Sequence, residues 1–163
     1  MKKNVMFMLL AFVALNLTAR TPAGGPDPGP AVFSKVLSAK VSPLIEAKFK
    51  RQYGPIVNVS WRVIEDVSIA TFIEQGTESE VFYYNDGEIF GFGKPVDKNV
   101  LPKVVNGSLN RWFSKGTIQE AYEFKTPDFP TRYYVRVIAP GYSAIASATE
   151  FGDITVYQKQ KIK

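Results

Sequence analysis

The chain has 163 residues, of which 20 are basic and 15 acidic, and it contains neither histidine nor cysteine. Nucleophile pairs of the Ser-His and Cys-His kinds, zinc sites built on those residues, and disulfide bonds are therefore excluded within this sequence. The net charge of +5 is mild, and the lysines near the C-terminus are typical of a solvated tail, so no nucleic-acid partner is expected.

Residues 1–19 have the three parts of a secretory signal peptide. Lys2 and Lys3 give a basic start, an apolar run extends from Val5 to about Leu17, and Ala19 is a small residue after which cleavage could follow. A retained anchor is the alternative, although the run is short for a membrane span. We therefore expect a periplasmic or secreted protein with no stable membrane insertion after cleavage.

Residues 20–30 read RTPAGGPDPGP, and this density of proline and glycine predicts a flexible linker. Residues 31–163 are long enough for one α+β domain. Within it, residues 31–40 have spacing that suits a helix or a short strand, and a helix is favoured.

The first clear helix is predicted at 42–53. A serine can cap its start, Pro43 falls in the first turn, and Gly54 follows its end. Ile45 and Phe49 lie on one apolar stripe, so one face of this helix requires a sheet to pack against.

Strands follow the helix. Apolar and polar residues alternate from Val57 to Val63, which indicates a half-buried antiparallel strand. Further strands are predicted at 67–74, 80–84 and 88–92, with a hairpin turn at Asn85-Asp86-Gly87.

The second half repeats this order. A shift of 60 residues places the stripe of a helix from about 102 to 114 on that of the first helix, and the strands match at slightly larger shifts because of a loop near 126–130. Two repeats, at about 42–97 and 101–158, would gain a shared core by pairing. Chance similarity between two amphipathic stretches is the alternative.

Three pairs of acidic residues are candidates for a chemical site: Glu65 with Asp66, Glu78 with Glu80, and Asp86 with Glu88. None has the repeated oxygen spacing of a calcium loop. We interpret them as solvated charges at turns, and we expect no catalytic residue, no metal and no cofactor.

A short helix opening at a proline, a strand with a central aromatic residue (Val59-Ser60-Trp61) and a strand that leads into an acidic turn (residues 82–87) together resemble the PepSY-like, β-lactamase-inhibitor-protein-like (BLIP-like) domains of secreted bacterial proteins. The similarity covers about 42–158. It implies two α-then-four-strand repeats that form one curved antiparallel sheet, with helices packed on one face and an open concave face. Most such proteins have no established activity, and the namesake inhibitor binds an enzyme across this face. The second repeat departs from the pattern at its turn (residues 150–153) and in its alanine-rich penultimate strand.

If Val81, Tyr83 and Ile89 face the helices, as the resemblance implies, the period of two sends a set of aromatic and aliphatic side chains to the opposite face. The predicted binding residues on that face are Phe82, Tyr84, Phe90, Phe92, Ile69, Ile73, Tyr134, Arg136 and Tyr157. Trp61 is predicted to lie in the core, and the alanines at 144, 146 and 148 to make room for Trp112 and Phe113. Two alternatives stay open: the faces are reversed, or the linker or a second copy of the protein covers the aromatic surface.

An exposed aromatic surface usually marks an interface. We therefore predict an exported, non-enzymatic binding or inhibitory module that meets a protein or peptide through this face. A carrier or sensor of a small apolar ligand is the alternative, and a carboxylate-based hydrolase is the third reading. A homodimer would be a further way to cover the face.

Overall fold

The structure, a computed structural model, describes residues 27–33, 40–56 and 58–162. The expected signal peptide and residues 20–26 of the expected linker lie outside this range. The elements in chain order are the 3-10 helix η1 (Gly29–Phe33), helix α1 (Pro43–Tyr53), strands β1 (Ser60–Ile64), β2 (Val67–Glu74), β3 (Thr77–Tyr84) and β4 (Ile89–Val96), the 3-10 helix η2 (Lys98–Val100), helix α2 (Lys103–Trp112), and strands β5 (Thr117–Lys125), β6 (Arg132–Ala139), β7 (Tyr142–Thr149) and β8 (Ile154–Lys161).

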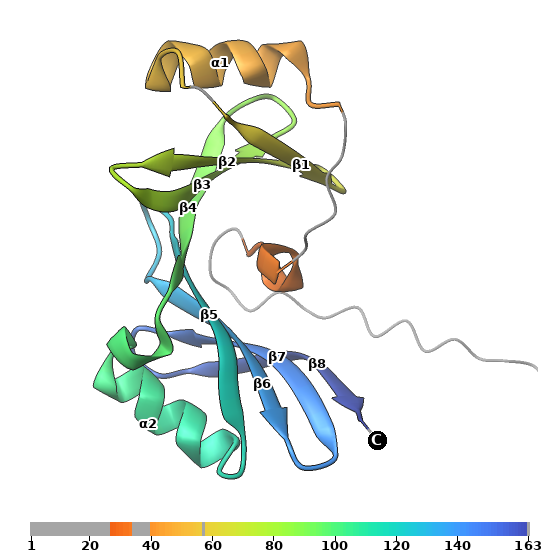
Figure 1. The fold of residues 1–163 in the computed structure, drawn as a ribbon, viewed down its shortest axis with the longest axis vertical. Helices are drawn as coiled ribbons and strands as arrows, with labels where there is room; N and C mark the ends of the chain where they lie inside the picture. Colours follow the sequence, from red (N-terminus) through yellow and green to blue (C-terminus); the bar gives the residue numbers. More distant parts are fainter. Residues whose placement is uncertain (1–26, 34–39, 57, 163) are drawn as a thin grey trace, which may run out of the picture.

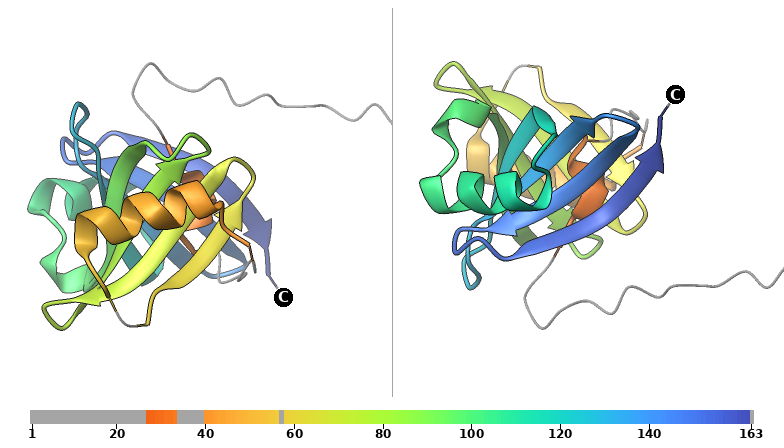
Figure 2. Two further views of the ribbon diagram at one scale, coloured as in Figure 1. Left: turned by 90° about the horizontal axis from the view of Figure 1, so that it is seen from above. Right: turned by 90° about the horizontal axis from the view of Figure 1, so that it is seen from below.

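All eight strands belong to one antiparallel sheet in which each strand pairs with the next along the chain. Figure 1 shows that this sheet is strongly curved, with α1 and α2 on its convex side and η1 within the curve. Views from both ends agree on this placement (Figure 2). The fold therefore has a convex face covered by two α-helices and a concave face that holds η1.

Helix α1 begins and ends as its sequence predicts. The Ser42 hydroxyl accepts a hydrogen bond from the Leu44 amide at 3.3 Å, and the Gly54 amide donates to the Lys50 carbonyl, where glycine supplies a φ of 72°. Ile45 and Phe49 are buried against the convex face, where the Phe49 ring lies 5.4 Å from that of Trp61 and 5.3 Å from that of Phe72. The predicted core role of Trp61 agrees with this packing.

Helix α2 packs over the alanines of β7. Val105, Leu109 and Phe113 are buried in one cluster with Ala144 and Ala146, where small side chains let the helix approach the sheet. Trp112, which was expected to share this space, is instead 61% exposed. The end of the helix turns it away from the sheet, so only Phe113 uses the room that the alanines leave.

The hairpin between β3 and β4 confirms the predicted turn. The Gly87 amide donates to the Tyr84 carbonyl at 2.8 Å, and Gly87 has a φ of 78° that favours glycine. The Lys48 ammonium group of α1 reaches this turn, 2.7 Å from a carboxylate oxygen of Glu88. The turn is thus tied to the helix that covers its sheet.

The predicted fold class, two α-then-four-strand repeats that form one curved antiparallel sheet with helices packed on one face, was wrong in its division into two repeats. The sheet is a single meander in which Phe92–Val96 of β4 pair with Ala121–Lys125 of β5, so neither half has an edge strand there. The apolar cluster on the concave face also draws side chains from both halves, including Phe82 and Tyr134. The 3-10 helix η1 lies on the face opposite α1 and α2. The molecule is one continuous sheet with apolar packing on both of its faces.

Candidate binding face

Residues 27–33, which we call the strap, lie on the concave face. They include the last four residues of the segment predicted to be a linker, and Gly29–Phe33 of the strap form η1. Val32 is buried at 6% exposure, in a cluster with Ile69, Phe82 and Tyr134 of the sheet. The end of the predicted linker and the first residues of the predicted domain therefore cover part of the predicted binding surface, which agrees with the open alternative that the linker covers it.

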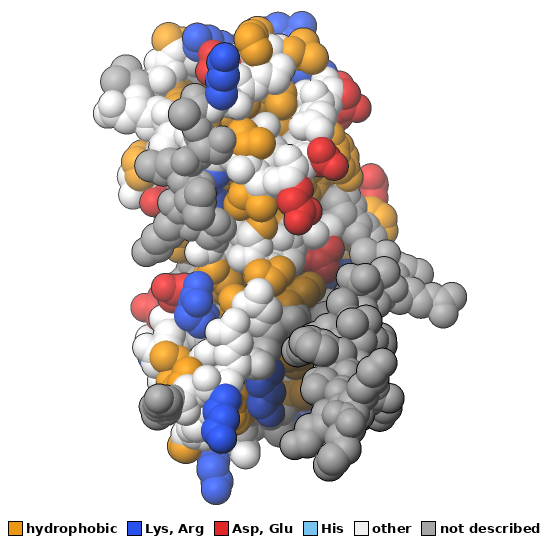
Figure 3. Space-filling view, turned by 90° about the vertical axis from the view of Figure 1, so that its right-hand side faces the viewer, with side chains coloured by type: hydrophobic (Ala, Val, Ile, Leu, Met, Phe, Trp, Pro, Cys, Tyr) orange, Lys and Arg blue, Asp and Glu red, His pale blue; other side chains and the backbone are white. Residues whose placement is uncertain are grey.

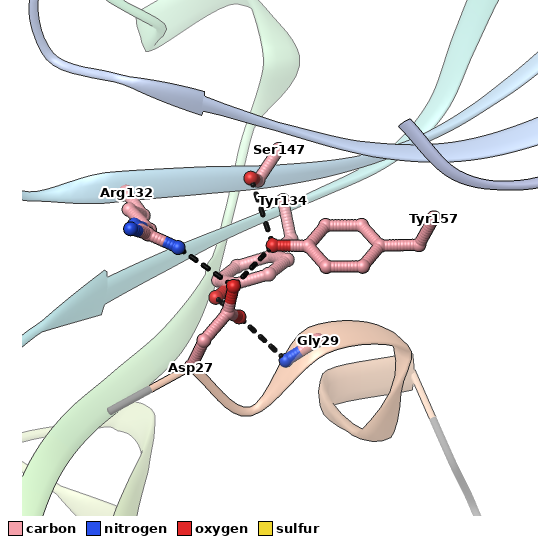
Figure 4. A network of polar contacts seen from close by, with 6 residues as sticks. All are labelled: Asp27, Gly29, Arg132, Tyr134, Ser147 and Tyr157. Carbon is pink, nitrogen blue, oxygen red and sulfur yellow. Dashed lines mark hydrogen bonds and ion pairs between the residues drawn. The ribbon is translucent and has the colours of Figure 1, made fainter. Parts of the chain in front are cut away.

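Asp27 anchors the strap through its carboxylate (Figure 4). Oδ2 lies 2.7 Å from Arg132 Nη1 and accepts a hydrogen bond from the Tyr157 hydroxyl at 2.5 Å. Oδ1 accepts hydrogen bonds from the Tyr134 hydroxyl and, at 2.8 Å, from the Gly29 amide. Ionised donors and acceptors make the stronger hydrogen bonds in proteins. Three of these four donors come from strands, so the sheet presents a ready-made carboxylate receptor.

The two tyrosines of the receptor stay protonated donors at neutral pH. Burial raises the pKa of Tyr134 above its ordinary value of 10.0, and the negative charge of Asp27 raises it further. Burial also raises the pKa of Tyr157, to about 12, with a second contribution from its hydrogen bond to Asp27. The Tyr157 hydroxyl lies 3.2 Å from Ser147 Oγ, which fixes its position.

The distal end of the strap makes an aromatic contact. The Arg136 guanidinium lies over the Phe33 ring, 5.1 Å from its centroid, and Arg136 Nε lies 3.0 Å from a carboxylate oxygen of Glu120. A guanidinium over an aromatic face is attracted by the ring quadrupole. The strap is therefore held at one end by charge and at the other by apolar and cation–π contacts.

A buried ionic cluster lies beside the strap. Glu80 Oε1 is 2.5 Å from Arg62 Nη2 and accepts from the Thr71 hydroxyl at 2.9 Å, and Oε2 accepts from the Tyr122 hydroxyl at 2.5 Å. Burial, together with the charge of Glu80, raises the pKa of Tyr122 well above its ordinary range. The interpretation of Glu80 as a solvated charge at a turn is wrong, because β3 begins at Thr77 and places Glu80 inside a strand.

This cluster forms one wall of a cleft of about 500 Å³ on the concave face. Val32 and Phe33 of the strap form part of another wall. The lining residues are Val32, Phe33, Arg62, Thr71, Glu78, Glu80, Pro95, Glu120, Ala121 and Tyr122. Figure 3, which looks at this side of the molecule, shows hydrophobic side chains exposed between acidic ones, with basic side chains at the top and in the lower half. The cleft thus combines apolar walls with charged groups held in fixed positions.

Eight of the nine predicted binding residues lie on the concave face. Ile69, Phe82, Phe90 and Tyr134 are buried there. Arg136 and Tyr157 contact the strap. Ile73 and Tyr84 are 62% and 42% exposed and form an open rim.

Phe92 is the exception. The register shifts between Phe82 and Tyr83, so that Phe82 pairs with Gly91 and Tyr83 with Ile89. This bulge leaves Phe90 on the concave side, where its ring lies 5.8 Å from that of Phe82, while Phe92 pairs with Val81 on the helix side. The strict period of two that placed Phe92 with Phe90 does not hold across a bulge.

Sequence reasoning missed Asp27, Arg132, Arg62 and Glu80 as parts of this face. The period of two carried a usable signal for Arg62 and Glu80. Glu80 lies two residues before Phe82 on the same strand, and Arg62 pairs with Ile69 across neighbouring strands, so all four side chains share one face. Asp27 gave no such signal, since it is a single carboxylate in a Pro/Gly segment.

Within the residues that the structure describes, no group of three or more acidic side chains could hold a metal ion. In the same part of the chain, no helix is long and apolar enough to cross a membrane.

No protein-family model matches the sequence, and no curated protein matches it. Among solved structures, the chain is similar to a protein of Bacteroides eggerthii described as periplasmic, with a TM-score of 0.63 and 18% identity over 76% of this chain and 91% of that one. A DUF2874 family protein of Bacteroides uniformis has a TM-score of 0.62 and 16% identity, over 75% of this chain and 90% of that one. A BLIP-like protein of Bacteroides fragilis has a TM-score of 0.57 and 17% identity, over 77% and 89%. These likenesses confirm the BLIP-like resemblance at the level of the fold, whereas the PepSY-like part stays a prediction.

Proposed function

We propose that this protein is an exported, non-enzymatic binding module that holds a segment of a protein partner on its concave face. The observation that carries the proposal is that this face already holds a polypeptide segment, the strap, through a carboxylate receptor and an apolar cluster. A surface with fixed donors and fixed aromatic rings recognises such a segment at little cost in ordering its own side chains. Its action on a partner is steric, because it covers whatever part of the partner it binds.

Export is supported by two observations. The first is the sequence pattern of residues 1–19, which predicts a secretory signal. The second is the fold shared with a protein of Bacteroides eggerthii described as periplasmic. The fold shared with a BLIP-like protein supports binding without catalysis. Fractionation of the producing cells, with N-terminal sequencing of the mature protein, checks this part of the proposal.

The open rim of the concave face provides the test. Ile73 and Tyr84 are exposed, so Ile73→Ser with Tyr84→Ser removes apolar contact area from the rim, including the Tyr84 ring that lies 4.5 Å from the Phe90 ring. Val104 and Phe151 are 55% and 69% exposed and belong to α2 and the turn before β8. The pair Val104→Ser with Phe151→Ser is therefore a matched control, since it also replaces one exposed aliphatic and one exposed aromatic side chain by serine.

Each variant is tagged, exported and used to capture proteins from the periplasmic and secreted fractions of the source organism. We expect the rim variant to lose a partner that the wild-type protein and the control variant retain, with similar melting temperatures for all three. Retention of the same partner by the rim variant would contradict the proposed binding face.

The cleft of about 500 Å³ favours a second candidate function, a carrier or sensor of a small apolar ligand. Trp61 packs against α1 and Trp112 belongs to α2, so tryptophan fluorescence would report poorly on this cleft. A thermal-shift screen of apolar compounds is the suitable assay. Saturable stabilisation that is abolished by Glu120→Trp, a bulky change at a half-exposed residue that lines the cleft, would favour the carrier over the protein-binding module.

A further inference from the structure

The carboxylate receptor belongs to the sheet and not to the strap. Arg132 and Tyr134 are on β6, Ser147 on β7 and Tyr157 on β8, and these strands pair side by side. Sites built on strands hold their geometry better than sites built on loops. The receptor therefore has the same donors to offer to any carboxylate that reaches it.

The receptor is also more stable with a carboxylate bound than without one. The Tyr134 side chain is fully buried, and its hydroxyl donates to Asp27. A buried donor that loses its acceptor is destabilising, and the Arg132 guanidinium, whose side chain is 15% exposed, loses a favourable charge interaction when the carboxylate leaves it. Removal of Asp27 thus creates a site with a preference for another carboxylate.

The strap resembles a bound peptide more than an integral element of the sheet. Pro28 and Pro30 restrict its backbone and remove two amide donors, and Gly29 has a φ of 51° with the Tyr157 ring 3.7 Å from where a Cβ would stand. Among the described hydrogen bonds between two backbone groups outside regular helices and strands, the strap donates one, from the Ala31 amide to its own Pro28 carbonyl. The strap therefore touches the sheet through side chains on its face and adds no strand to its edge.

We propose that Arg132, Tyr134 and Tyr157 form a recognition site for an acidic side chain of a protein partner, and that the strap occupies this site as an intramolecular competitor. This inference rests on the proposed function. The partner segment it requires places an Asp or Glu about five residues before apolar residues, as the strap places Asp27 before Val32 and Phe33. Binding of the partner then requires the strap to leave.

The strap sequence itself is the probe. A synthetic peptide of residues 24–34 (GGPDPGPAVFS), with blocked ends and a fluorophore, is titrated with the mature protein and with its Asp27→Ala variant, and fluorescence anisotropy is measured. An intramolecular competitor acts at an effective concentration in the millimolar range, so we expect Asp27→Ala to bind the peptide at least about tenfold more tightly than the wild type. Should Asp27→Ala fail to fold, Asp27→Asn keeps the shape of the side chain and replaces it.

Two controls test the chemistry. A peptide with Asn in place of Asp should bind the Asp27→Ala protein about tenfold more weakly, because it loses the charge-assisted hydrogen bonds. Adding Tyr157→Phe to that protein should weaken binding of the original peptide, whereas adding Tyr142→Phe, on the neighbouring strand and outside the site, should leave it unchanged.

Equal binding by the wild type and Asp27→Ala, or equal binding of the two peptides, overturns the inference. These results do not depend on Ile73 or Tyr84, so they are separate from the capture experiment. Capture without strap competition would leave the proposed function standing and remove only this inference. If Asp27→Ala binds the peptide more tightly but no partner is captured, the receptor would serve only to hold the strap of the same chain, and this would count against the proposed function.

Discussion

Arg62 Nη2 lies 2.5 Å from Glu80 Oε1, and both side chains are less than a tenth exposed. The two residues are on β1 and β3, with β2 between them. A buried ion pair is tolerated when hydrogen bonds satisfy its remaining lone pairs, and here the hydroxyls of Thr71 and Tyr122 supply them. The pair therefore depends on four strands, since Tyr122 comes from β5.

Glu80→Gln tests how strongly this cluster is coupled. The amide keeps the size of the side chain but removes the negative charge that three donors share, so it leaves the Arg62 guanidinium in a buried site with less compensating charge. We expect the free energy of unfolding to fall by about 3 kcal/mol. Urea denaturation monitored by circular dichroism measures it.

Glu120→Gln is the matched control. Glu120 also lines the cleft and pairs with Arg136 at 3.0 Å, but its side chain is 46% exposed. An exposed pair contributes about 0–1 kcal/mol, so this variant should differ little from the wild type. Equal losses in the two variants would mean that burial does not set the strength of the Glu80 cluster.

Gly93→Ala tests the close packing of β4 under the cluster. A Cβ at Gly93 would stand 2.1 Å from the Tyr122 hydroxyl oxygen, and Tyr122 is 3% exposed and held by Glu80. Because the ring has no room to move, we expect a loss of about 1–3 kcal/mol in the free energy of unfolding.

Gly107→Ala provides the opposite expectation. Gly107 lies inside α2, and a Cβ there would meet nothing within 4 Å. Replacing glycine in a helix interior gains about 0.5–1 kcal/mol, so this variant should unfold at a higher urea concentration than the wild type. Destabilisation by both alanines would indicate that space at Gly93 is not the cause.

Local sequence patterns predicted much of the concave face. Alternation along β2, β3 and β6 placed Ile69, Phe82 and Tyr134 together, since a period of two is a property of each strand alone. The pattern failed at Phe92 because a bulge depends on how two strands pair. The same limit explains the fold class, since the apolar cluster on the concave face draws side chains from both halves and from η1, and no local repeat contains that information.

The strap could not be predicted from its composition. Its prolines and glycines indicate a linker, and its attachment depends on Asp27 meeting Arg132 and Tyr157, which are 105 and 130 positions away. Contacts at such separations are set by the curvature of the whole sheet. The aromatic residues other than Phe92 thus share the concave face as predicted, and in this structure a segment of the same chain lies on them, whereas binding of a partner there stays a prediction.

Tyr83→Phe tests a buried hydroxyl. Tyr83 is fully buried on the helix side, and its hydroxyl has no hydrogen-bond partner among the described residues. Removing a buried group without a partner is neutral or stabilising, so the free energy of unfolding should stay the same or rise by up to about 1 kcal/mol.

Tyr134→Phe makes the same change on the concave side. Its hydroxyl donates to the Asp27 carboxylate, and a hydrogen bond to a charged group contributes about 1.5–3 kcal/mol. We expect this variant alone to be destabilised. A loss in Tyr83→Phe as large as in Tyr134→Phe would show that the Tyr83 hydroxyl has a partner after all.

Alkaline pH should weaken the attachment of the strap and with it the fold. Burial raises the pKa of Tyr134 and Tyr157 above the ordinary value of 10.0, to about 12 for Tyr157. The unfolded chain loses these protons first, so the stability that the Tyr157 hydroxyl contributes is fully present below pH 10 and is lost as pH rises through about 12, whereas that of the Tyr134 hydroxyl is lost only at higher pH. Urea midpoints measured across this range should fall more steeply for the wild type than for Tyr157→Phe, whereas Tyr142→Phe should follow the wild type. Because lysines also titrate there, the difference between the two phenylalanine variants isolates the receptor, and parallel curves for all three proteins would contradict the assignment of Tyr157 to it.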